Sequence, residues 1–186
     1  MTASSMPIVL RSSFSWAALY TLQAIFYASN YWSLGLFYST GLIVSMALLA
    51  APLFAFLWLH YMGRVFQITG KWLGGNALRT DLRAAVAQSK IPILFFVPLW
   101  FYFIFVHSKH VFILGATYPS PILINGLSLF LGFISQSIRV QAIRKLQSFS
   151  LLRAAFNAAI CLLISSFIFF FLIAIVRFIY PLWIFS

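Results

Sequence analysis

The chain has 186 residues, of which 63% are hydrophobic and only 7% are charged, and its mean hydropathy is +1.03. A soluble domain carries about 25% charged residues, whereas the stretch from Ser12 to Gly63 contains no Lys, Arg, Asp or Glu at all. This composition excludes a soluble globular domain. It predicts an integral membrane protein, folded as a single all-α membrane domain over residues 1–186.

The net charge of +11 comes from twelve basic residues and one acidic residue. In a soluble protein this balance would suggest a nucleic-acid partner. Here the basic residues lie between the hydrophobic runs, where Lys and Arg set the orientation in the membrane and face anionic lipid headgroups. We therefore expect lipid as the partner and no nucleic acid.

The hydrophobic runs predict about five membrane-crossing helices, since each needs about 20 mostly apolar residues. The first run contains several polar residues and is the weakest, so a tilted or partly re-entrant helix is an alternative there. No removable signal peptide is expected at the N-terminus. The predicted spans are residues 14–32, 36–62, 91–106, 122–138 and 154–176.

The second span carries a strip of small residues. Ala47, Ala51 and Ala55 recur every four residues and so share one helix face. A smooth strip of this kind lets another helix approach closely. Pro52 lies inside the run, and we expect it to kink the helix.

Between the second and third spans, residues 64–90 are polar and contain a cluster of glycines that permits a sharp reversal. Asn76 is a candidate cap for the following helix. That helix, residues 76–89, is amphipathic and is predicted to lie at the membrane surface; an ordinary solvated linker helix is the alternative. Pro92 begins the third span and Pro98 is expected to bend it.

The later loops differ in character. Residues 107–118 are predicted to form a loop. Residues 139–153 are basic and amphipathic, with apolar side chains at roughly helical steps, and lead into the last span. The apolar positions in this connector are Val140, Ile143, Leu146 and Phe149.

Counting the basic residues on each side predicts the orientation. With five spans, all twelve except Lys109 and Arg177 fall on the side of the N-terminus. Cytoplasmic loops carry the excess of Lys and Arg. We therefore predict a cytoplasmic N-terminus and an external C-terminus.

The candidate groups for chemistry are few. The single acid, Asp81, lies outside the spans and is expected to pair with a nearby basic residue, which argues against ion-coupled transport and carboxylate catalysis. His107 and His110 have a spacing that one metal ion accepts, but a third ligand is absent nearby. We therefore predict no catalytic residue, no metal site and no cofactor. The buried polar candidates are Asn125, Gln136 and Asn157, expected to bond to neighbouring helices or to line a pocket, and Cys161, expected to be a small buried hydrophobe.

The segment GRVFQITGKWLGGNALRTDLRAAVAQSKIPILF resembles the central signature of the Yip family of Ypt/Rab-interacting multispanning membrane proteins. A helix of small residues ends there in a glycine-rich turn, then come a polar-faced helix and a proline that begins the next span. The later segment SFSLLRAAFNAAI is similar to the family's final turn and last span. The matching residues are Gly74, Gly75, Ala87, Pro92, Arg153 and Ala154.

The resemblance implies a non-enzymatic protein that organises membranes or assembles partners, as in vesicle trafficking. Eukaryotic members carry an N-terminal Asp-Leu-Tyr-Gly-Pro motif that this sequence lacks, so a bacterial cell membrane is favoured over the ER or Golgi. Self-association or other membrane proteins are the expected partners. The residues expected to contact anionic lipid at the inner face are Arg79, Arg83, Arg144 and Lys145. The rival hypothesis is a permease or channel component for a small neutral solute, using Asn125, Gln136 and Asn157.

Overall fold

The computed structural model describes residues 6–115 and 121–184, and every element in these ranges is helical. The long helices are α1 (Met6–Tyr31), α2 (Thr40–Trp72), α5 (Pro121–Gln147) and α6 (Leu151–Ile184). Shorter pieces are η2 (Leu34–Leu36), α3 (Arg79–Gln88), η3 (Ile91–Phe95), α4 (Phe96–His107) and η4 (Ser108–Phe112). The all-α membrane bundle expected from composition is confirmed.

Among the described residues, four segments are long and apolar enough to cross a membrane. α1 is not one of them, in agreement with its rating as the weakest span. The second of these segments joins α3, η3, α4 and η4 into one candidate crossing, so the amphipathic helix continues into the predicted third span. The four segments are Thr40–Trp72, Arg79–Phe112, Gly126–Gln147 and Leu151–Ile168.

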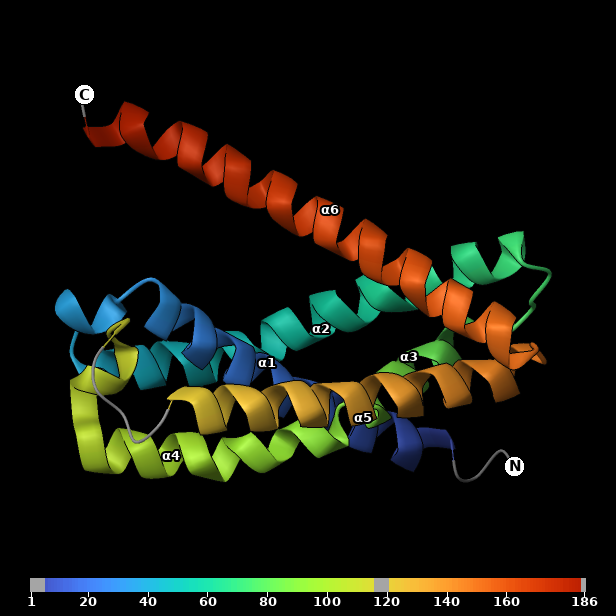
Figure 1. The fold of residues 1–186 in the computed structure, drawn as a ribbon, viewed down its shortest axis with the longest axis horizontal. Coiled ribbons are helices and arrows are strands. Elements are labelled where there is room, and N and C mark those ends of the chain that lie inside the picture. The colour runs from blue at the N-terminus through green and yellow to red at the C-terminus, as the bar shows by residue number, and fades with distance from the viewer. Residues whose placement is uncertain (1–5, 116–120, 185–186) are drawn as a thin grey trace.

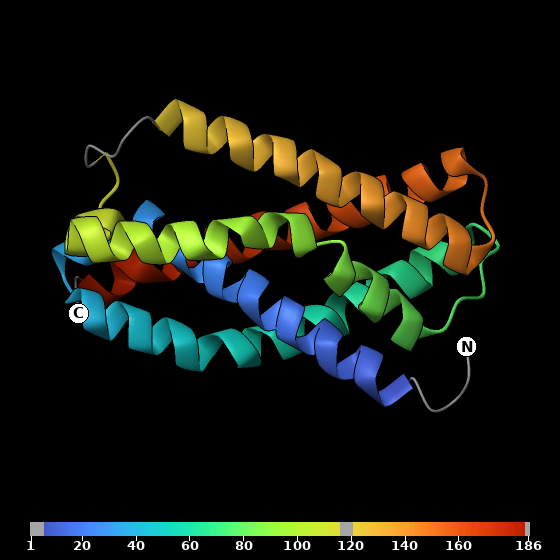
Figure 2. The same ribbon diagram turned by 90° about the horizontal axis from the view of Figure 1, so that it is seen from below.

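The helices run back and forth between two ends of the bundle, and the start of α1 and the end of α6 lie at opposite ends (Figure 1). α1 packs along α2, where the Ala47, Ala51 and Ala55 strip is buried as predicted. The close approach lets Thr21 Oγ1 donate a hydrogen bond of 2.8 Å to the Ala51 carbonyl. Figure 2 shows α2 bent between its ends, which agrees with the expected effect of Pro52.

The helices extend further than the hydrophobic runs that predicted them. α2 continues ten residues past Met62, the predicted end, and α5 continues past Ile138 to Gln147. A helix of 33 residues is about 50 Å long, which exceeds the roughly 30 Å hydrocarbon core. A helix can continue beyond the hydrocarbon core where its residues become charged. The end of a hydrophobic run therefore lies before the end of the helix that contains it.

Two local predictions were wrong. Asn76 does not cap the amphipathic helix: α3 has Leu78 at its N-cap, without a side-chain cap hydrogen bond. Residues 107–112 are not an open loop, because η4 turns back into the bundle and buries Val111 and Phe112. There Phe112 stacks against Trp100 with a ring-centroid distance of 6.4 Å. The two apolar residues at the end of this segment, Val111 and Phe112, explain why it packs against the bundle.

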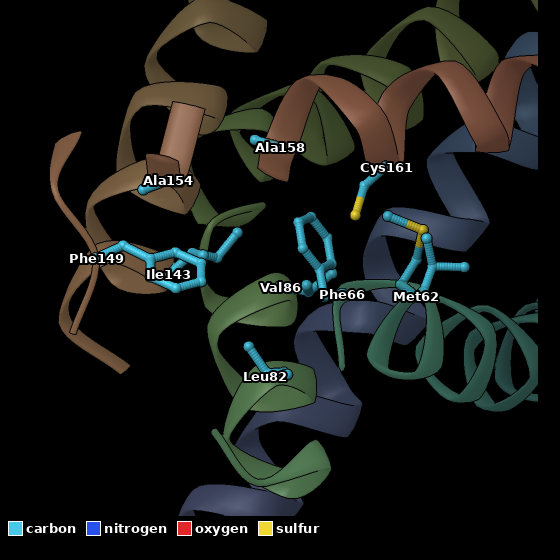
Figure 3. Close-up of a cluster of buried hydrophobic side chains, with 10 residues drawn as sticks. Met62, Phe66, Leu82, Val86, Ile143, Phe149, Ala154, Ala158 and Cys161 are labelled. Carbon is cyan, nitrogen blue, oxygen red and sulfur yellow. The ribbon is translucent and has the colours of Figure 1, made fainter. Parts of the chain in front are cut away.

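Two apolar clusters form the main core. One lies toward the η2–η4 end and joins α1, α2 and α4 around Phe26 and Trp100. The other joins α2, α3, α5 and α6 around Phe66, which is fully buried. Figure 3 shows the Phe66 ring between Cys161 of α6 and Val86 of α3. This second cluster supports the end of the bundle where most of the charged residues lie.

Candidate functional site: the basic end of the bundle

One end of the bundle combines the start of α1, the end of α2, α3, the end of α5 and the start of α6 (Figures 1 and 2). We call it the basic end, because these helix segments, together with Lys90 just after α3, carry all the Lys and Arg residues except Lys109 and Arg177. Helices that alternate in direction bring these segments together although they are far apart in the sequence. The clustering of basic residues at one end therefore follows from the antiparallel order of the helices.

The glycine-rich turn at this end terminates α2. Gly74 has a φ of +85°, which L-residues rarely adopt. The Gly75 N–H donates to the Gly70 carbonyl (2.8 Å) and the Gly74 N–H to the Lys71 carbonyl (3.0 Å). These two bonds form a Schellman motif, which satisfies carbonyls at the helix end. The sharp reversal predicted from the glycines is therefore present.

Gln147, the last residue of α5, connects this turn to the α5–α6 turn. Its Nε2 donates a 3.2 Å hydrogen bond to the Phe66 carbonyl. Its side chain occupies the space that a Cβ at either Gly70 or Gly75 would need, and the Phe149 ring also touches the Gly75 position. The two stretches that carry the family resemblance are thus in direct contact.

The remaining motif residues have separate places. Ala87 is fully buried beside Ala17 and Ala55, where its size lets three helices meet. Pro92 lies in the first turn of η3, as predicted. Ala154 is buried in the Phe66 cluster, whereas the side chain of Arg153, in the first turn of α6, is exposed.

An open groove of about 730 Å³ lies along the end of α5 and the start of α6. It is lined by two exposed basic side chains together with polar and apolar residues: Gln141, Arg144, Lys145, Ser148, Phe149 and Leu151. Two expected lipid contacts, Arg144 and Lys145, therefore share one concave surface. Mixed basic and apolar lining suits a ligand with an anionic group and hydrocarbon.

The other two expected lipid contacts differ from this pair. Arg79 and Arg83 are only half-exposed and lie against α2. Arg79 Nη2 donates to the His60 carbonyl (3.0 Å), and the Arg83 side chain covers Gly63. They contribute to helix packing as well as charge.

A polar network lies beside the Phe66 cluster. Thr69 Oγ1 donates to Asn157 Oδ1 (2.9 Å) and lies 3.2 Å from Cys161 Sγ. Asn157 thus forms a hydrogen bond to a neighbouring helix, which is one of the two roles predicted for it. Cys161 is buried as expected. Gln136 instead accepts a bond from Arg139 of its own helix. The side chain of Asn125 lies outside the described residues.

Sequence reasoning missed two buried cations. Lys90, between α3 and η3, is 6% exposed, and Arg139 of α5 is 4% exposed. Lys90 Nζ lies 4.6 Å from the centre of the Tyr20 ring, and the Arg139 guanidinium lies 5.5 Å from that of Phe66. Both were interpreted as loop residues. The available signal was the spacing of Ser135, Arg139 and Ile143, which share one buried face of α5.

These cations are incompletely compensated. Burying an ion costs several kcal/mol, while a cation–π contact returns about 0.5–2 kcal/mol. The only acid, Asp81, accepts a 3.5 Å hydrogen bond from Thr80 Oγ1 and makes none of the expected ion pairs among the described residues. Nothing in the part of the chain that the structure describes supplies an anion to Lys90 or Arg139.

The described residues contain no group of three or more His, Cys, Asp or Glu side chains placed to hold a metal ion. His107 and His110 lie at the opposite end, around η4. The groups that gather at the basic end are therefore cations, amides and hydroxyls, which bind anions and hydrogen-bonding groups.

No family model, curated protein or solved structure matches this chain. The Yip resemblance consequently depends on the residues named above and stays a prediction.

Proposed function

We propose that this chain is a non-enzymatic membrane organiser of Yip type, which binds anionic lipid at its basic end and assembles with itself or with other membrane proteins. The observation that carries the proposal is the groove bearing Arg144 and Lys145. The groove lies on the same α5–α6 turn that Gln147 and Phe149 join to the Gly74–Gly75 turn. The two segments that resemble the family thus support the proposed binding surface.

The proposal includes an orientation, with the N-terminus and the basic end in the cytoplasm of a bacterial cell. Inner leaflets are anionic, and basic residues near the membrane surface are attracted to them by about 1 kcal/mol each. The placement of Lys109 on η4, at the far end from the start of α6, supports this arrangement.

Cysteine labelling tests the orientation. In a Cys161→Ser background, Lys109→Cys is expected to react with a membrane-impermeant maleimide on intact cells. Arg153→Cys is expected to react only after the membrane is permeabilised. Both positions are exposed in the folded chain, so a difference in labelling reports the side of the membrane. Labelling of Arg153→Cys alone on intact cells would refute the orientation.

The lipid proposal predicts selective enrichment of anionic lipid around the protein. Chain extracted with its lipid annulus from vesicles of phosphatidylglycerol and phosphatidylcholine should carry more phosphatidylglycerol than the bulk. The double variant Arg144→Gln/Lys145→Gln should lose at least half of this enrichment, measured by lipid mass spectrometry. Lys109→Gln is the matched control because it removes one exposed charge at the opposite end. Equal losses in both would contradict a specific basic-end surface.

The rival permease hypothesis needs the membrane-depth amides to converge on a passage. Gln136 bonds to Arg139, and Asn157 bonds to Thr69 in a fully buried position. Their separate partners favour packing roles. Proteoliposomes of the same chain should therefore show no protein-dependent flux of small neutral solutes, and such a flux would favour the rival.

A further inference from the structure

The two buried cations occur on segments that also carry buried polar atoms without hydrogen-bond partners. Among the described residues, the buried unpartnered atoms include Arg139 Nε, Ser135 Oγ and Gln23 Oε1. Lys90 Nζ faces the Tyr20 ring. These residues come from α1, the α3–η3 junction and α5, so the cluster lies where three parts of the chain meet.

The positions of Tyr20 in α1 and Ser135 in α5 along the bundle axis can be compared from a contact between the two helices. α1 and α5 run in opposite directions, and Tyr27 of α1 hydrogen-bonds Ser128 of α5 at 2.9 Å. Seven residues back along α1 is Tyr20, and seven residues forward along α5 is Ser135. Tyr20 and Ser135 therefore lie at one level. Arg139 lies about one helical turn from it toward the basic end, and Gln23 lies about one turn from it toward the η2–η4 end. η3, which follows Lys90, contacts both helices.

The charges in this cluster have the same sign. Lys90 and Arg139 are both cationic, and α5, which carries Arg139, contacts both α3 and η3 on either side of Lys90. Tyr20 and Gln136 contribute only a ring face and an amide oxygen. The only acidic residue in the sequence is Asp81, nine positions before Lys90, and it accepts a hydrogen bond from Thr80. A stable arrangement of two buried cations calls for an anion, and that anion has to come from outside the chain.

We propose that Lys90 and Arg139 bind one phosphate group, carried by a phospholipid headgroup or by a free phosphate ion. A guanidinium offers a planar set of donors that matches phosphate oxygens, and an ammonium adds a compact charge. The Ser135 hydroxyl supplies a further donor at the same level. This site is distinct from the exposed groove, because Arg139 and Ser135 are buried whereas Arg144 and Lys145 are exposed on α5.

The test uses the full chain, delipidated in a non-ionic detergent. The probes are inorganic phosphate, phosphatidylglycerol, and diacylglycerol as a phosphate-free control. We expect thermal unfolding to shift upward with phosphatidylglycerol or phosphate but not with diacylglycerol, because a ligand that binds only the folded state stabilises it. Native mass spectrometry should show one bound phosphate group per chain that survives dilution. A lipid site responds to phosphatidylglycerol at concentrations where inorganic phosphate has no effect; a free-ion site responds to both.

Substitutions assign the binding to these residues. Lys90→Met should weaken binding at least tenfold while leaving the unliganded protein as stable as the wild type or more so, because a buried charge has been removed. Arg139→Lys keeps the charge and should retain part of the shift. Lys109→Gln removes an exposed charge at the opposite end of the bundle, so it is the control and should leave this binding unchanged.

Two results would overturn the proposal: no saturable binding of either phosphatidylglycerol or inorganic phosphate by the wild-type chain, or equal affinity for the bound probe in the wild type and Lys90→Met. If Lys90→Met does not fold, binding by the wild type and its reduction in Arg139→Lys decide the question. Arg144 and Lys145 belong to the proposed lipid groove, so failure of that function leaves this site standing, and the converse also holds.

Discussion

Replacing Gly75 by alanine is expected to lower the free energy of unfolding by about 2 kcal/mol, within the 1–3 kcal/mol typical of overpacking a filled core. The new Cβ would collide with the Gln147 side chain and come within 2.8 Å of Phe149 Cζ. Gln147 is buried and bonded to the Phe66 carbonyl, so it has little room to withdraw. Equilibrium unfolding in mixed detergent, followed by circular dichroism, measures the change.

A double-mutant cycle separates this steric cause from a backbone effect. Gln147→Ala should cost about 1 kcal/mol alone, the usual net worth of one hydrogen bond, and should relieve most of the Gly75→Ala penalty. Gly74→Ala is the matched control: its φ of +85° disfavours alanine, yet nothing lies within 4 Å of the added Cβ. Its cost, about 1–2 kcal/mol, should therefore be unaffected by Gln147→Ala. Additive effects of Gly75→Ala and Gln147→Ala would rule out the contact as the cause.

The features that depend on local chemistry were predictable from the sequence. The Ala47, Ala51 and Ala55 strip could be placed at a helix contact because residues four apart share a face. The reversal at Gly74 followed from the conformational freedom of glycine, and Pro92 from its preference for a first turn. In each case the residue type restricts the backbone or the packing without reference to the rest of the fold.

The features that depend on distant partners were not predictable. Hydropathy placed the end of the second span at Met62, but Arg64 and Lys71 continue the helix in an aqueous or headgroup environment until Gly74 ends it. Lys90 was counted as a surface charge because its sequence neighbours are polar. Its burial comes from Tyr20, which is seventy positions away and reaches it only in the folded bundle. Pairwise charge and hydropathy patterns contain no information on such contacts.

The way α6 is attached leads to the second large expected effect. Figure 1 shows α6 crossing α2 near the basic end, with its C-terminal half running clear of the other helices. Its contacts with α2 and α5 therefore lie in its first turns, where Ala154, Asn157 and Cys161 are fully buried. Asn157 provides the main polar link, through its Oδ1 to Thr69 of α2.

We expect Asn157→Ala to destabilise the chain by about 2 kcal/mol, combining the lost hydrogen bond with the cavity left by the amide. Thr69→Val keeps the shape of the side chain and should cost about 1 kcal/mol, because Asn157 Oδ1 would keep only the weak thiol donor of Cys161, 3.5 Å away. The coupling between the two changes should be about 0.6 kcal/mol and no more than about 1.7 kcal/mol, the average and the maximum found for hydrogen bonds between membrane helices. Thr80→Val, at an exposed position, is the control and should be nearly neutral.

Because the attachment of α6 depends on these few turns, Asn157→Ala should also increase proteolysis at the α5–α6 turn before the bundle unfolds. Simple additivity, with unchanged proteolysis, would mean that apolar packing around Ala154 holds α6 without help from the polar link.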